Sequence, residues 1–113
     1  MKYLLILPAL VSTIAFADPR CFAQLERTDG KRIEERALTA VPGFPGGGKW
    51  EGEIGDGFFS VTRDAAGDDY LLLISRGPAY QDGLAVRGNF NKRGELRASL
   101  VTPEQTFRIV CNR

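Results

Sequence analysis

Apolar and polar residues alternate along this chain in short runs, and turn-forming residues interrupt the runs every eight to twelve positions. Residues 95–101 are an example, in which Leu96, Ala98 and Leu100 alternate with polar or charged neighbours. A period of two residues is typical of a strand with one face in the core. No stretch after residue 17 keeps apolar residues at helical spacing for three turns. The pattern therefore predicts an all-β domain.

The pattern predicts eight strands, each bounded by turn residues. They cover residues 20–27, 32–40, 49–54, 58–63, 70–75, 84–90, 95–101 and 106–111. The second has an ambiguous phase, because Ile33, Ala37 and Val41 share a face with Glu35. We expect a bulge in this strand, since one extra residue changes which face the following side chains occupy.

The sixth and seventh predicted strands can be placed in register. Residues 91–95 fit a hairpin loop of three residues in which Gly94 takes the left-handed conformation. Pairing Asn91 with Glu95 then sets Phe90 opposite Leu96, and the next inward residues also face one another. A slip of one residue would turn charged side chains toward the core.

The two cysteines lie near the ends of the predicted domain, Cys21 in the first strand and Cys111 in the last. In an up-and-down meander with an even number of strands, the first strand begins where the last one ends. Eight strands therefore bring the cysteines together as a disulfide, closing a loop of about 90 residues and contributing roughly 4–5 kcal/mol. We expect a small eight-stranded antiparallel barrel closed by pairing of the first and last strands. A two-sheet β-sandwich is the alternative.

The first residues have the pattern of a secretion signal. A positively charged start precedes an apolar run over residues 3–14, and Ala15 and Ala17 supply the small residues of a cleavage site. We expect residues 1–17 to be removed, leaving residues 18–113 as a single all-β domain. The expected location is the periplasm or the outside of the cell, without membrane insertion.

Composition excludes several kinds of chemistry. The chain has 15 Lys and Arg against 14 Asp and Glu, which argues against a nucleic-acid partner. It has no His, so His-based catalysis and His metal sites are excluded. Asp64, Asp68 and Asp69 lack the ligand spacing of a calcium loop, and we expect neither a metal nor a cofactor. A hydrolase using carboxylates such as Glu51 and Glu53 is a remote third possibility, because these fall on the polar outer face.

Two long connections, residues 41–48 and 76–83, could bind a partner through loop side chains. The alternative is that their aromatic residues fold over the ends of the core. By strand parity the two connections leave opposite ends of the domain. The candidate binding residues on them are Phe44, Arg76, Tyr80 and Asp82.

Residues 75–80 read Ser-Arg-Gly-Pro-Ala-Tyr. The segment and the overall plan resemble bacterial periplasmic lysozyme inhibitors of the membrane-bound/C-type family, which present a Ser-Gly-x-x-Tyr loop. The segment departs from that loop by one inserted residue, and the Trp and Lys-Gly that follow in the family are missing. The resemblance implies a secreted barrel that inhibits an enzyme.

These observations predict a small exported binding or inhibitor module rather than an enzyme, with another exported or envelope protein as its partner. The alternative is a structural envelope protein that associates with itself. Residues 71–74 favour the alternative, because four consecutive apolar residues give one strand two apolar faces. The oligomeric state is left open.

Overall fold

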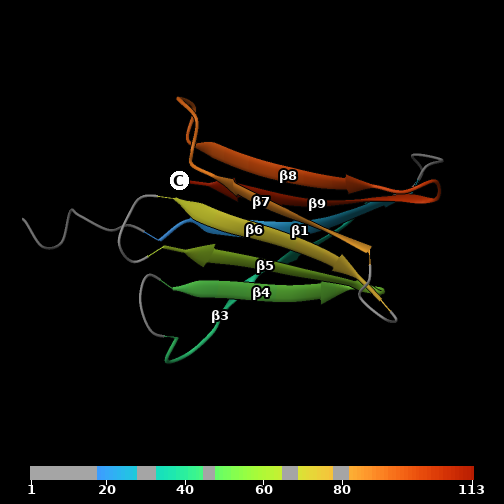
Figure 1. Ribbon diagram of the computed structural model, residues 1–113, viewed down its shortest axis with the longest axis horizontal. Helices are drawn as coiled ribbons and strands as arrows, with labels where there is room; N and C mark the ends of the chain where they lie inside the picture. Colours follow the sequence, from blue (N-terminus) through green and yellow to red (C-terminus); the bar gives the residue numbers. More distant parts are fainter. Residues whose placement is uncertain (1–17, 28–32, 45–47, 65–68, 78–81) are drawn as a thin grey trace, which may run out of the picture.

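Two antiparallel sheets form the molecule, and the computed structural model describes residues 18–27, 33–44, 48–64, 69–77 and 82–113 (Figure 1). One sheet has the order β2-β1-β9-β8 and the other the order β3-β4-β5-β6-β7. The all-β prediction is therefore confirmed. The strands are β1 (Arg20–Arg27), β2 (Ile33–Ala37), β3 (Thr39–Ala40), β4 (Lys49–Ile54), β5 (Gly57–Arg63), β6 (Tyr70–Arg76), β7 (Asp82–Gly88), β8 (Glu95–Val101) and β9 (Gln105–Asn112).

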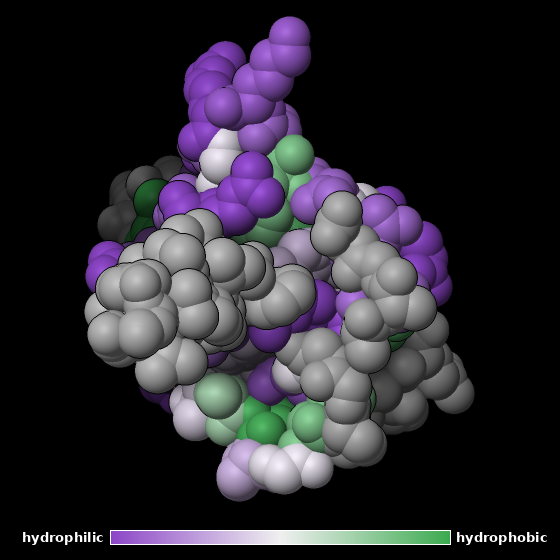
Figure 2. All heavy atoms as spheres, turned by 90° about the vertical axis from the view of Figure 1, so that its left-hand side faces the viewer, coloured by the Kyte–Doolittle hydropathy of each residue, from purple (hydrophilic) through white to green (hydrophobic). Residues whose placement is uncertain are grey.

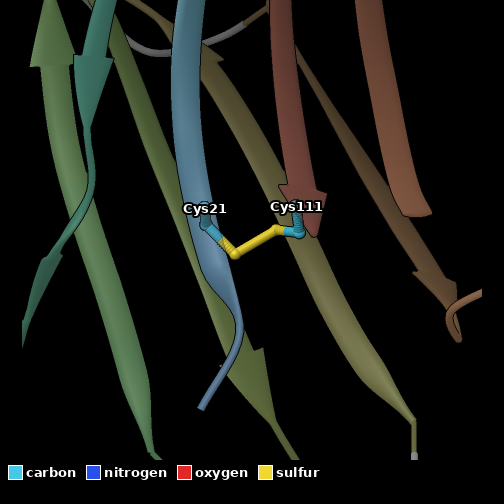
Figure 3. The surroundings of a disulfide bond; sticks show 2 residues. All are labelled: Cys21 and Cys111. Atoms are coloured by element: carbon cyan, nitrogen blue, oxygen red, sulfur yellow. A yellow bond between two sulfur atoms is a disulfide. The ribbon is translucent and has the colours of Figure 1, made fainter. Parts of the chain in front are cut away.

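The first and last strands pair as expected. β1 and β9 run antiparallel, with Cys21 opposite Cys111 and Leu25 opposite Phe107. A disulfide joins the two cysteines across this pair (Figure 3). Both cysteines are buried, because their side chains share the inward face with Ala23 and the core residues of β9. The disulfide prediction is confirmed.

The second predicted strand is divided at Leu38. β2 pairs with β1 in the four-stranded sheet, whereas β3 pairs with β4 in the five-stranded sheet. The side chain of Leu38 enters the core, while Ile33 and Ala37 are exposed. The ambiguous phase therefore has a physical cause, since the chain passes from one sheet to the other at this residue. One predicted strand becomes two, and the described residues hold nine strands.

The core lies between the two sheets. Its large, fully buried side chains alternate along the strands, as a half-buried sheet requires. They are Ile54, Phe59, Val61, Leu72, Ile74, Phe107 and Ile109. Phe107 of the four-stranded sheet packs on Phe59 of the five-stranded sheet, with ring centroids 6.3 Å apart. Gly57 makes room for that contact, because a Cβ there would lie only 2.7 Å from the Phe107 ring.

The turn at residues 91–95 has the predicted form, but the ladder beyond it does not form. The Asn91 N–H donates to the Glu95 carbonyl (2.9 Å), and Gly94 has a φ of 76°. β7 ends at Gly88, because the Asn89 side chain accepts a bond from the Phe90 N–H (2.7 Å) and the Phe90 ring packs edge-on against Tyr70.

β7 and β8 are not hydrogen-bonded neighbours within the described strands, and they diverge away from the turn (Figure 1). We call the boundary between β7 and β8 the seam. Three apolar side chains there are only partly buried, namely Leu84 and Val86 of β7 and Leu100 of β8. No closed barrel is found among the described strands, and the alternative of a two-sheet sandwich fits the arrangement as well. The physical reason is that each of the two strands pairs with its own sheet, while apolar side chains fill the space between the sheets.

Candidate binding site

A hollow opens at the end of the molecule where β1 begins. Its volume is about 480 Å³, within the range of small-ligand and side-chain pockets. The start of β1, the bend between β2 and β3, and β4 supply its walls. The lining residues are Pro19, Arg20, Cys21, Phe22, Ala37, Leu38, Ala40 and Trp50. Arg20 is the one charged residue among them.

The bend at Leu38 builds this hollow. The Leu38 N–H donates to the Cys21 carbonyl (2.9 Å), which holds the crossing chain against the start of β1. Leu38 then packs on Gly52 of β4, where a Cβ would lie 2.8 Å from the Leu38 side chain. The missing side chain at Gly52 therefore lets the crossing chain approach the sheet closely. Trp50, 8% exposed, closes the inner wall.

Two aromatic residues at this end lie next to cations. The Arg63 guanidinium sits 5.5 Å from the centre of the Trp50 ring, and it also pairs with the Asp18 carboxylate at 3.3 Å. The Lys49 ammonium lies 5.6 Å from the centre of the Phe44 ring. Phe44 belongs to the connection that leaves the hollow at β3 and returns to it at β4, and it is half-buried. Phe44 therefore lies near the start of β4, where Lys49 precedes the hollow-lining Trp50, but it is not itself one of the lining residues.

The polarity of this end is uneven. Figure 2 looks at the left-hand end of Figure 1, and it shows apolar atoms gathered along the lower edge, on the side of β3. Hydrophilic atoms crowd the upper edge, on the side of the turn between β7 and β8. The Arg20 side chain has no ion pair or hydrogen bond with the part of the chain that the structure describes. An apolar partner group with a negative charge nearby would suit such a surface.

Arg76 lies at the opposite end and is held by two carboxylates. Its guanidinium is 3.3 Å from Asp56, in the turn between β4 and β5, and 3.3 Å from Glu104, between β8 and β9. The Gly77 N–H also donates to the Asp56 carbonyl (2.7 Å). The contact with Glu104 ties the two sheets together, whereas the contacts with Asp56 lie within the five-stranded sheet. The recognition role expected of Arg76 stays a prediction.

The four residues singled out from the sequence do not form one site. The end of β3, which Phe44 follows in the chain, and the end of β6, which carries Arg76, lie at opposite ends of the molecule (Figure 1), as strand parity implied. Tyr80 lies outside the described residues. Asp82 begins β7, where its backbone faces Arg76, and its side chain is not described.

The acidic residues weighed for chemistry are dispersed. The Asp64 N–H donates to the Asp69 carbonyl (3.0 Å) and closes a turn, while Asp68 lies outside the described residues. Glu51 pairs with Lys49 (3.3 Å) on the outer face, on the side away from the core, and Glu53 is exposed. Within the described ranges, no group of three or more His, Cys, Asp or Glu residues could hold a metal ion. No described helix is long and apolar enough to cross a membrane.

Comparison with family models, with curated proteins and with solved structures gives no match. The assignment of a site therefore rests on geometry. Sequence reasoning singled out Phe44 but missed the hollow, because its walls come from three separate segments that only the fold brings together. One feature of the sequence could have indicated the hollow, namely the interrupted alternation of apolar and polar residues over 32–40. Where a strand changes the face that it turns inward, the edge of the core is left open.

Proposed function

We propose that this chain is a small exported binding module, which holds another exported or envelope protein at the hollow beside Cys21. The disulfide supports export, since such bonds persist outside the reducing cytoplasm. The apolar run and small residues at positions 1–17 support it as well. Where the partner is an enzyme, the module acts as an inhibitor.

The observation that carries the proposal is the hollow itself, about 480 Å³ and lined by apolar residues around Arg20, whose side chain has no ion pair among the described residues. Concave apolar surfaces with a few well-placed polar groups are the usual form of binding sites. An apolar side chain of the partner fills the space against Trp50 and Phe22, and a carboxylate next to it meets Arg20. Binding of this kind needs no catalytic group.

A closed eight-stranded barrel remains a proposal for this module. It differs from the two-sheet form only in the pairing of β7 with β8. That seam lies at the opposite edge of both sheets from β2 and β3, which form the hollow. The binding proposal therefore holds for either form.

The test captures partners from periplasmic and extracellular extracts with the oxidised protein, identifies them by mass spectrometry, and titrates each purified partner. Ala40→Glu places a negative side chain at the exposed mouth of the hollow, and Phe44→Ser removes the neighbouring ring. We expect each to weaken binding by at least about tenfold. Ser99→Glu, on the exposed face of β8, is the matched charge control and leaves affinity unchanged. Circular dichroism confirms that every variant folds.

Two outcomes would overturn the proposal in different ways. Affinity that survives Ala40→Glu and Phe44→Ser but falls with Tyr80→Ser would move the site to the connection between β6 and β7. Absence of any titratable partner would exclude a protein-binding module. Arg20→Glu tests the chemistry of the partner separately, because reversing this charge weakens only a partner that presents a negative group.

A further inference from the structure

The outer face of the five-stranded sheet carries apolar side chains that the core does not use. In β6, Leu72 and Ile74 point inward and are fully buried, whereas Leu71 and Leu73 point outward. Leu71 is 36% exposed. Sheet faces turned to water normally carry polar residues, so an apolar stripe on such a face indicates contact with something else.

The strand register arranges this face in rows, with charges at the β4 side and leucines at β6. Ser60, between them in the central strand, is only 4% exposed, because the longer side chains of its neighbours rise on both sides. One row contains Lys49, Thr62 and Leu71, and the next contains Glu51, Ser60 and Leu73. The two rows carry opposite charges in β4, where Lys49 in one corresponds to Glu51 in the other. In β7 the first row ends in Arg87 and the second in Ala85.

We propose that this face binds a second copy of this chain, across a two-fold axis that lies perpendicular to the strands and between these two rows. The axis exchanges the rows. Lys49, which pairs with Glu51 of its own chain at 3.3 Å, then also lies over the partner's Glu51, so the two pairs form a network of four alternating charges. Leu71 lies over the partner's Leu73. Symmetry makes each contact twice, as in isologous dimers, where one self-complementary patch serves both copies.

A hollow on the same face fits this arrangement. It has a volume of about 200 Å³ and is lined by Thr62, Asp64, Leu71 and Arg87. The two-fold axis brings the partner's Phe58, from the row beyond Ser60, over this hollow. Phe58 is an outward aromatic side chain that is only half-buried in the single copy. Its ring meets the Arg87 guanidinium, a favourable cation–π pairing, and Arg87 has no ion pair with the described residues.

The size of the face sets the expected affinity. Four strands about 4.8 Å apart and three rows about 6.8 Å apart cover roughly 400 Å² per copy. The total of roughly 800 Å² lies below that of standard stable interfaces, so we expect a weak dimer that forms only at high protein concentration. This face does not include the hollow beside Cys21, and only Lys49, which touches Phe44, is close to both. Leu71→Lys therefore tests the dimer separately from the proposed function.

Sedimentation velocity of the oxidised protein, from about 10 µM to about 1 mM, tests the proposal. We expect a reversible dimer that Leu71→Lys weakens by at least about tenfold. Val101→Lys is the matched control, since Val101 is 71% exposed on the other sheet, and it leaves association unchanged. Glu51→Lys places two cations opposite each other and weakens the dimer. The double change Lys49→Glu with Glu51→Lys restores it.

The charge exchange separates this interface from other forms of association. A dimer that survives Leu71→Lys but is lost with Val101→Lys would place the interface on the four-stranded sheet and overturn the proposal. A protein that remains monomeric up to 1 mM would also overturn it. Failure of the double exchange to restore a dimer lost in Glu51→Lys would refute the two-fold arrangement. Thermal unfolding of each variant shows that its fold is kept.

Discussion

Glycines determine where two pairs of segments meet in this molecule, because they carry no side chain. Gly52 admits Leu38 where the chain crosses between the sheets, and Gly57 admits the Phe107 ring from the opposite sheet. A Cβ at Gly52 would lie 2.8 Å from the Leu38 side chain, and one at Gly57 would lie 2.7 Å from the Phe107 ring. Both distances are shorter than those that real Cβ atoms show. The neighbours differ in stiffness, because a leucine can rotate and a fully buried phenylalanine cannot.

We therefore predict that Gly57→Ala destabilises the protein by about 1–3 kcal/mol, since the added methyl forces Phe107 or the strand to move. For a domain of this size, the loss lowers the melting temperature by roughly 4–8 °C per kcal/mol. Gly88→Ala is the matched control, because its Cβ would meet Leu96 at 3.5 Å, an ordinary contact. Equal melting temperatures for the two variants would contradict this account of the Phe107 packing.

At the scale of elements, the edges of the sheets decide the form of the fold. β2 and β3 are one continuous stretch of chain interrupted at Leu38, and they connect the sheets along one side. β7 and β8 are joined only by the turn at residues 91–95, and each has a single hydrogen-bonded neighbour. Edge strands leave backbone N–H groups open to water on their free side.

Hydrogen exchange tests this seam. We predict that the amides of β7 and β8 on the sides facing the seam exchange at least about a hundredfold faster than those of β9, which pairs on both sides. Two-dimensional NMR of the oxidised protein in deuterated buffer measures the rates. Uniformly slow exchange along both strands would mean that β7 and β8 pair in solution and that the barrel is closed.

At the scale of the whole molecule, one covalent bond joins the ends of the described fold. The Cys21–Cys111 disulfide spans a sequence separation of 90 and sits on the β1–β9 pair. In the chain-entropy account, it acts mainly by restricting the unfolded chain, and the benefit grows with loop length. Small domains have a total stability of only about 5–15 kcal/mol, so the contribution of the disulfide is a large share.

We predict that Cys21→Ala with Cys111→Ala lowers the free energy of unfolding by roughly 4–5 kcal/mol. Urea titration with circular dichroism detection compares the oxidised protein, the protein reduced with dithiothreitol, and the double variant. The reduced protein and the double variant should agree, and reductant should not affect the variant further. An unchanged urea midpoint after reduction would show that the β1–β9 pairing holds without help from the bond.

The sequence by itself determined the local strands and which of them meet first and last. Alternation identified every strand to within two residues at either end, apart from the break at Leu38. The turn at residues 91–95 and the Cys21–Cys111 pair also followed from the sequence, since their causes are local backbone geometry and strand parity. These features depend on residues that are near one another in sequence or on the number of strands between the two cysteines.

Only the tertiary structure decided how the sheet edges meet and where a partner could bind. The separation of β7 from β8 depends on how apolar side chains fill the space between the sheets, which no strand encodes alone. Nothing in the sequence indicated that Arg76 pairs with Asp56 and Glu104, because both carboxylates come from other turns. The hollow beside Cys21 depends on Leu38 crossing over Gly52. Contacts between distant segments are set by packing, and packing is a property of the assembled fold.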